Sequence, residues 1–207
     1  MRDAILFDMD GTLVDWAKPN AISWNETFRR YGWWERELTG EDFRNIAGHT
    51  TAEIGKMCFP NIPEEESYRR IAIASAEEVP NLLINAKWEH CYLPNKEFLP
   101  ELAKKYKIFI ISNCMAGYID AFFTLYGGRE AVIDYRDNRD GISKPENIRQ
   151  IVAQYGLKNP LYVGDTVMDQ KAAQEAGVSF LFASYGYGKV EGAPRLEKLA
   201  DLLHFEN

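Results

Sequence analysis

The chain has 207 residues, of which 46% are hydrophobic and 27% charged, a composition typical of one globular domain or of a domain with a sizeable insertion. The net charge of −7 argues against nucleic acid as a partner, although lysines and a metal ion can still attract a phosphorylated small molecule into a pocket. Three cysteines without a C-x-x-C pair, no apolar run of membrane-span length and no signal-peptide pattern predict a cytoplasmic protein without a membrane partner.

Short apolar runs predict the strands of a parallel sheet. Continuous runs of this length indicate strands that are covered on both faces. In chain order they are residues 4–7, 108–111, 161–163 and 180–182, with residues 131–133 as a candidate fifth strand.

Helical patterns alternate with these strands. Ile148 and Ile151 belong to an apolar stripe at helical spacing, for which Pro145 suits the first turn and Gly156 the end. A second helix is expected to end near Gly177. The alternation of strands and helices predicts an α/β fold with right-handed crossovers.

The segment of residues 16–88 interrupts this alternation. It has no convincing buried strand but contains amphipathic stretches at residues 22–31 and 68–79. A segment of this length is not an ordinary connection between strands, so we expect an inserted helical domain. Four residues mark its internal turns: Gly40, Gly48, Pro60 and Pro63.

Polar and acidic side chains follow three of the predicted strands. The carboxyl ends of parallel strands share one edge of the sheet, where ligands bind in open α/β folds. The residues at these ends are Asp8, Asp10, Gly11 and Thr12 after the first strand, Ser112 and Asn113 after the second, and Asp165 and Asp169 after the third.

The acidic residues at this edge favour a metal ion. Asp8, Asp10 and Asp165 would crowd like charges together, and a hard divalent cation resolves that cost. Mg²⁺ suits such oxygen ligands and adds waters and a substrate phosphate. Asp169 shares a helix face with Asp165, and Lys144 adds a positive charge suited to a phosphoryl oxygen.

These pieces, in this order, resemble the four motifs of the haloacid dehalogenase superfamily. The sequences are Phe-Asp-Met-Asp-Gly-Thr-Leu at residues 7–13, Ser-Asn at 112–113, Lys-Pro at 144–145 and Gly-Asp-Thr-Val-Met-Asp at 164–169. The resemblance covers the whole chain and is greatest to the phosphoglycolate-phosphatase-like branch. It implies a Rossmann-like α/β core of residues 1–15 and 89–207 and an α-helical cap of residues 16–88.

The resemblance also implies roles for the motif residues. Asp8 would attack phosphorus and form an aspartyl-phosphate, and Asp10 would act as general acid and then as general base. Lys144 would neutralise charge on the phosphate. Mg²⁺ would be held by Asp8, the main-chain carbonyl of Asp10, Asp165 and, directly or through water, Asp169.

Substrate-binding roles are implied for a second group of residues. Ser112 and Asn113 would bind the phosphoryl group, and Gly11 and Thr12 would line the same pocket. His49 is a candidate contact from the cap, although a helix cap at Thr50 or Thr51 explains that loop equally well. The glycines after the fourth strand, Gly186 and Gly188, fit a plain loop better than a pocket rim.

Structural alternatives remain open for several of these residues. Asp8 and Asp10 could form a strand-end turn, since Asp-Gly is common in turns. Asp165 could be a helix N-cap, and Asp169 a solvated helix residue. Lys144-Pro145 lacks the second proline that usually follows in this superfamily.

The predicted function is a Mg²⁺-dependent phosphatase that acts on a small phosphomonoester. The first alternative is a sugar-phosphate phosphomutase, although those relatives carry a histidine and an arginine where Asn20 and Thr51 stand here. A dehalogenase would lack the acid at Asp10. A non-catalytic binding protein on the same fold is a third alternative.

Overall fold

The computed structural model describes residues 2–33, 36–138 and 141–205. The chain divides into two compact units. The core unit comprises Met1–Asp15 and Lys87–Asn207, and the inserted unit comprises Trp16–Ala86. No helix in the described ranges is long and apolar enough to cross a lipid bilayer.

The core unit is built on one parallel sheet. Among the described residues six strands form this sheet, in the order β3-β2-β1-β4-β5-β6. This arrangement confirms the predicted α/β class with a Rossmann-like sheet. The strands are β1 (Ala4–Phe7), β2 (Lys107–Ile111), β3 (Val132–Arg136), β4 (Pro160–Gly164), β5 (Ser179–Ala183) and β6 (Arg195–Leu196).

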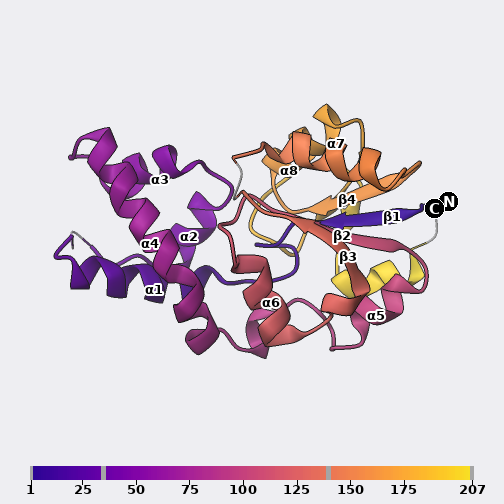
Figure 1. Cartoon of the computed structure of the whole chain (residues 1–207), viewed down its shortest axis with the longest axis horizontal. Coiled ribbons are helices and arrows are strands. Elements are labelled where there is room, and N and C mark those ends of the chain that lie inside the picture. Colours follow the sequence, from indigo (N-terminus) through magenta and orange to yellow (C-terminus); the bar gives the residue numbers. More distant parts are fainter. Residues whose placement is uncertain (1, 34–35, 139–140, 206–207) are drawn as a thin grey trace. The chain divides into compact units, whose positions relative to one another are not determined.

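Helices cover both faces of this sheet (Figure 1). On one face lie α7 (Lys144–Gln154) and α8 (Val167–Glu175), and on the other lie α5 (Phe98–Ala103) and α6 (Tyr118–Tyr126). The predicted Pro145 is in the first turn of α7, and Gly177 follows α8 with a positive φ of 71°. The described part of the core unit also contains three short 3₁₀ helices: η1 (Trp88–His90), η2 (Arg129–Ala131) and η3 (Leu199–His204).

The apolar runs are buried because alternate side chains of each strand serve opposite faces. In β1, Ala4 and Leu6 belong to one buried cluster with Ile148 of α7 and Ala173 of α8. Ile5 lies between them in the strand and is equally buried, so it faces the layer of α5 and α6. A strand buried on both faces is therefore apolar without interruption, as the sequence pattern predicted.

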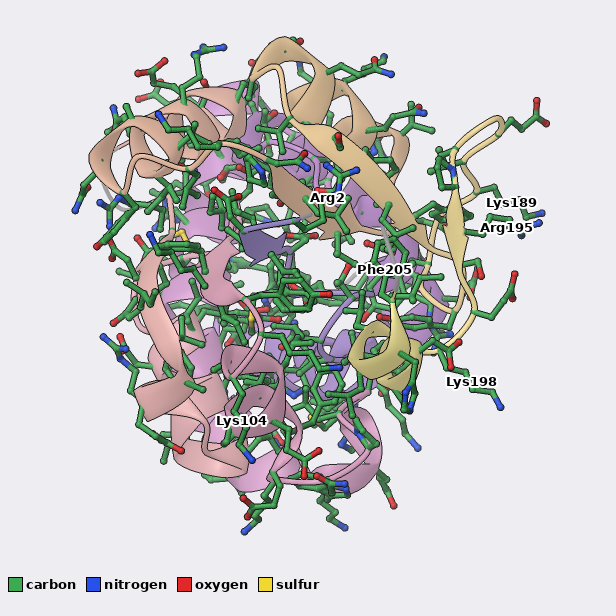
Figure 2. The ribbon with its side chains drawn as sticks, turned by 90° about the vertical axis from the view of Figure 1, so that its right-hand side faces the viewer. Arg2, Lys104, Lys189, Arg195, Lys198 and Phe205 are labelled. Carbon is green, nitrogen blue, oxygen red and sulfur yellow. The ribbon has the colours of Figure 1, made fainter. Side chains whose placement is uncertain are left out.

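The outer edge of the sheet beyond β5 is short and charged. The strand β6, which the sequence did not predict, has only two residues. Arg195 in it and Lys198 just after it are exposed and project outward (Figure 2). Short edge strands with charged side chains resist pairing with other chains.

The inserted unit is helical, as predicted. Its helices are α1 (Ala17–Arg30), α2 (Gly40–Ile46), α3 (Thr51–Cys58) and α4 (Glu64–Asn85). Helix α1 packs against α4 and α2, and α3 packs against α4. Aromatic contacts fill the interior, with Trp24 edge-on to Phe43 at 4.7 Å and Phe28 edge-on to Phe59 at 5.0 Å between ring centroids.

We predict that Asn25→Ala destabilises the inserted unit. The buried Asn25 side chain donates to the Leu38 carbonyl at 2.8 Å and accepts from the Leu38 N–H at 2.9 Å. Its removal leaves two buried backbone groups unpaired, which costs about 2–3 kcal/mol. Urea unfolding measures the loss. The control Arg29→Ala, on the same helix as Asn25, removes an exposed ion pair with Glu37 and should cost less than about 1 kcal/mol. Equal losses would contradict this account.

Candidate active site

The polar residues meet where adjacent parallel strands end. β1 lies between β2 and β4 in the sheet, so the residues that follow these strands share one edge. The N–H of Asp8 donates to the Val163 carbonyl of β4 at 2.9 Å, and the N–H of Ser112 donates to the Arg136 carbonyl of β3 at 3.0 Å. Backbone pairing thus continues to the first polar residue and fixes its position relative to the neighbouring strand.

Three predicted metal ligands form a buried acid cluster. Asp8, Asp165 and Asp169 each place a carboxylate oxygen within 4.8 Å of the others, and we call these three residues the acid cluster. Their exposed fractions are 6%, 0% and 0%. Because Asp169 is buried, the alternative that it is a solvent-exposed helix residue is excluded.

Lys144 lies inside this cluster. Its Nζ is 2.9 Å from Asp8 Oδ1 and 2.7 Å from Asp169 Oδ1, and the residue is 8% exposed. Lys144 is the first residue of α7, and Pro145 fits in the first turn of that helix. The absence of a second proline after Lys144-Pro145 therefore does not displace the lysine. The structure therefore brings Lys144 together with the acid cluster, as the sequence predicted.

The carboxylates destabilise one another's charge. Burial, together with repulsion from Asp169, raises the pKa of Asp8 to about 6, although Lys144 opposes the shift. Burial and the charges of Asp169 and Asp8 raise the pKa of Asp165 well above its ordinary value. Burial alone would lower the pKa of Lys144, but Asp169 and Asp8 outweigh it and raise that pKa well above its ordinary value. The lysine is therefore charged, and one ammonium faces three acids.

Asp169 has both of its oxygens engaged within the protein. Oδ1 accepts from Lys144, and Oδ2 accepts from the N–H of Thr166 at 3.0 Å and from its Oγ1 at 2.6 Å. Thr166 is the N-cap of α8, and its hydroxyl in turn accepts from the Asp169 N–H, which completes a capping box. Asp169 thus anchors Lys144 and the first turn of α8. The N-cap is Thr166 and not Asp165, so that alternative for Asp165 is excluded.

Asp165 has one anchored oxygen and one open oxygen. Oδ2 accepts from the N–H of Tyr187 at 2.7 Å. Oδ1 is buried and has no hydrogen-bond partner among the described residues. A buried carboxylate oxygen without a partner is costly unless a cation or water completes it.

Glycines make room for this carboxylate. A Cβ on Gly11, which has a φ of +75°, would collide with Asp165 Oδ2, and a Cβ on Gly186 would collide with Asp165 and with the Gly11 carbonyl. Gly188 packs equally closely on the Asp165 backbone. The prediction of a plain loop at Gly186 and Gly188 is therefore wrong, because this loop holds Asp165 from the side of β5.

A divalent cation fits the donors that these residues present. The acid cluster offers only oxygen ligands, which hard cations prefer, and Asp165 Oδ1 is open. With all three acids ionised and Lys144 protonated, the group carries two net negative charges. A divalent ion would cancel them.

Asp10 lies beside the acid cluster and outside it. Its Oδ1 accepts from the Tyr118 hydroxyl at 2.8 Å. Burial raises the pKa of Asp10 to about 7, with the Tyr118 hydrogen bond opposing the shift and the charge of Asp8 adding to it. A carboxyl group that titrates near neutrality can both give and take a proton. The sequence did not predict this role of Tyr118, because nothing in it indicates that an aromatic residue at the start of a helix is a partner of Asp10.

The turn after β1 is held by its own backbone and by two tyrosines. The Gly11 N–H donates to the Val14 carbonyl at 2.8 Å, and the Thr12 N–H donates to the Met9 carbonyl at 3.1 Å. The Thr12 carbonyl accepts from the Tyr185 hydroxyl at 2.9 Å, and the Asp15 side chain accepts from the Tyr187 hydroxyl at 3.0 Å. These contacts give Gly11 and Thr12 a structural role, and their binding of substrate stays a prediction.

The remaining predicted substrate contacts differ in exposure. Ser112 is buried, with its Oγ 3.4 Å from the Cys114 N–H, whereas Asn113 is exposed. In the inserted unit, Thr50 caps α3 through a capping box with Glu53. His49 Nδ1 lies 3.5 Å from Glu53 Oε2 in the same turn. The capping alternative is right for Thr50, and a substrate role for His49 stays a prediction.

Comparison with known proteins identifies the family. A family model described as haloacid dehalogenase-like hydrolase matches residues 5–183, a range that contains Lys144 and the whole acid cluster. This chain belongs to the haloacid dehalogenase-like hydrolase family. The resemblance seen in the four motifs is thereby confirmed.

Individual relatives within this family match nearly the whole chain. Phosphoglycolate phosphatase of Aquifex aeolicus is 29% identical over 198 residues, which are 90% of this chain and 86% of the relative. Phosphoglycolate phosphatase of Rhodobacter capsulatus is 23% identical over 216 residues, or 97% and 94%. The crystal structure of a predicted phosphoglycolate phosphatase from Haemophilus somnus has a TM-score of 0.80 at 20% identity and matches over 98% and 97% of the two chains. The predicted enzyme class, a phosphatase of this family, is confirmed.

We predict that Lys144→Met strongly destabilises the core unit of this hydrolase when divalent ions are removed. The change leaves the buried acids without a counter-charge, which costs about 3–5 kcal/mol. Urea unfolding in chelator measures the loss. The control Lys56→Met breaks an exposed pair with Glu64 at 3.1 Å and should cost less than about 1 kcal/mol. A comparable loss in both variants would show that the Lys144 ion pairs do not stabilise the core.

Proposed function

We propose that this chain hydrolyses a small phosphomonoester in a Mg²⁺-dependent reaction, through an aspartyl-phosphate on Asp8. The observation that carries the proposal is the position of Asp8 at the end of β1, buried within the acid cluster and bound by Lys144 Nζ at 2.9 Å. A positive charge beside a buried carboxylate favours the ionised form of that carboxylate, and the ionised form is the nucleophile.

The first half-reaction transfers the phosphoryl group to the protein. A carboxylate oxygen of Asp8 bonds to phosphorus while the ester P–O bond breaks. Asp10 gives its proton to the departing oxygen, so that an alcohol leaves and Asp10 becomes a carboxylate. Lys144 offsets negative charge on Asp8 and on the phosphoryl oxygens, and Ser112 and Asn113 donate hydrogen bonds to the same group.

The second half-reaction restores the protein. Asp10 removes a proton from a water molecule, and that water attacks phosphorus. The bond between phosphorus and Asp8 then breaks, orthophosphate leaves, and Asp10 holds the proton needed for the next cycle. One carboxyl group thus serves both halves, for which a pKa near neutrality is suitable.

Asp8 and Asp165 would hold Mg²⁺, with the Asp10 carbonyl as a further ligand and Asp169 supporting the site through Lys144. The bound ion would supply charge neutralisation and orientation of the phosphoryl oxygens. The open Oδ1 of Asp165 supports this choice of ligand, and the engagement of both Asp169 oxygens favours an indirect role for that residue.

The inserted unit is proposed to select the substrate. The chain leaves and re-enters the core unit at paired segments: the Asp15 N–H donates to the His90 carbonyl at 2.8 Å, and the Tyr92 N–H donates to the Leu13 carbonyl at 2.9 Å. Both crossings are thus tied to the turn that carries Asp10. A helical lid attached there can close over a substrate and exclude water. The names of the curated relatives make phosphoglycolate the first compound to test.

For the nucleophile, we predict that Asp8→Asn lowers turnover about a thousandfold or more without loss of folding, because the amide keeps the shape and lacks the attacking charge. Orthophosphate release from a panel of phosphomonoesters measures the loss, and circular dichroism checks the fold. The exposed Asp201→Asn is the matched control and should behave like the parent. Parent-like turnover by Asp8→Asn would exclude Asp8 as the nucleophile. Conversion of a sugar phosphate to an isomer without orthophosphate release would instead indicate a mutase.

For the metal, we predict that chelation abolishes turnover and that added Mg²⁺ restores it. Asp165→Asn should raise the Mg²⁺ concentration for half-maximal rate by about tenfold or more, since it removes a charged ligand. Asp201→Asn again serves as the control. Full turnover of an aryl phosphate in excess chelator would overturn the metal assignment.

For the inserted unit, we predict that His49→Ala changes the ranking of substrates while the Mg²⁺ requirement stays the same, because the proposed lid would act on the leaving group and not on the metal. The measurement is relative kcat/KM for several phosphomonoesters, with a severalfold change expected. His204→Ala, an exposed change in the core unit, is the control. Unchanged ratios in His49→Ala would remove His49 from the substrate-binding residues.

A further inference from the structure

Tyr118 makes a contact with Asp10 that the proposed reaction leaves unexplained. We propose that Tyr118 is a positioning residue for proton transfer, which holds one oxygen of Asp10 so that the other carries the proton to the leaving group. This inference rests on the proposed function, because it assumes that Asp10 is the general acid.

The geometry makes Tyr118 a rigid donor. It is the first residue of α6, follows Gly117 with its φ of +88°, and is 2% exposed. A tyrosine ring buried to this extent has little freedom to move its hydroxyl. That hydroxyl lies 2.8 Å from Asp10 Oδ1, a good length for an O–H···O bond to a carboxylate.

The backbone around Asp10 is already fixed, so its side chain is the part that needs orientation. The Gly11 N–H donates to the Val14 carbonyl at 2.8 Å, and the Leu13 N–H donates to the Met9 carbonyl at 2.8 Å. Within this turn the carboxyl group can still rotate about its own bonds. The hydrogen bond from Tyr118, on the helix that follows the neighbouring strand β2, restricts that rotation.

The donor also decides which oxygen carries the proton. A protonated carboxyl group has one O–H donor, and its other oxygen remains an acceptor. With Oδ1 accepting from Tyr118, the proton of neutral Asp10 resides on Oδ2. In the transfer, the O–H bond at Oδ2 breaks and the proton bonds to the ester oxygen as its P–O bond breaks, which leaves Asp10 ionised with Oδ1 still bound to Tyr118.

A purely structural role for Tyr118 makes a different prediction. If the hydroxyl only anchors the start of α6, its loss affects all substrates alike. If it orients the acid, its loss matters most when the leaving group needs a proton. Phenol needs one, because its pKa is about 10, as for tyrosine. 4-Nitrophenol is a much stronger acid and leaves readily as its anion.

The test is kcat/KM of Tyr118→Phe for phenyl phosphate and for 4-nitrophenyl phosphate, which have similar shapes. This parameter covers the first half-reaction only, so later hydrolysis of the aspartyl-phosphate does not enter it. We expect about a tenfold or larger fall for phenyl phosphate and less than about a threefold fall for 4-nitrophenyl phosphate. The ratio of the two values from one preparation is independent of the fraction of folded enzyme.

Tyr126→Phe is the matched control. Tyr126 lies on the same helix, is also 2% exposed, and donates its hydroxyl to the Lys87 carbonyl at 2.9 Å. Its loss should leave the ratio between the two substrates unchanged. An equal fall for both substrates in Tyr118→Phe, or no fall in either, would overturn the inference.

Asp10→Asn separates this inference from the proposed function. It should show the same selectivity as Tyr118→Phe with a larger fall for phenyl phosphate. If Asp10→Asn affects both substrates equally, Asp10 is not the general acid and the proposed mechanism fails at that step. If Asp10→Asn is selective and Tyr118→Phe is not, the mechanism stands and only the role of Tyr118 is wrong.

Discussion

The ammonium group of Lys144 binds Asp8 and Asp169 at 2.9 and 2.7 Å inside the core unit, and the rest of the site is arranged around these two ion pairs. Among the residues that the structure describes, Lys144 carries the one positive charge that is paired with the acid cluster. Because buried charges of one sign are costly, the remaining negative charge favours a bound divalent ion. Burial of Asp8, together with repulsion from Asp169, raises the pKa of Asp8 to about 6.

The fold supplies the frame that holds these charges. Neighbouring strands β2, β1 and β4 end at one edge, and backbone hydrogen bonds continue to the first polar residue beyond β1 and β2. The loop after β5 then contributes two glycines and the N–H of Tyr187, which hold Asp165 by one oxygen. A side chain at Gly186 would displace that carboxylate, so the loop and the acid must keep their present shapes together.

Residues that follow a predicted strand or open a helix were predictable, including their convergence at one edge of the sheet, whereas hydrogen-bond partners without such a position were not. The strands at residues 4–7 and 108–111 were predicted because burial on both faces makes a strand continuously apolar. The acids of the cluster were predicted because each directly follows such a strand or opens the next helix. Tyr118, Tyr187 and the two-residue β6 were missed. Tyr118 and Asp10 are 108 positions apart in the chain, and no periodicity or spacing signals such a hydrogen bond. The loop glycines resemble those of any turn until the carboxylate beside them is known.

Calorimetric titration of the substrate-free protein with Mg²⁺ tests the central claim most directly, since binding is measured apart from turnover. The charge balance of the acid cluster and Lys144 predicts one ion bound per chain, with binding strongly weakened in Asp165→Asn and retained in Asp201→Asn. A parent protein that binds no Mg²⁺, or that binds it equally well after Asp165→Asn, would contradict the account.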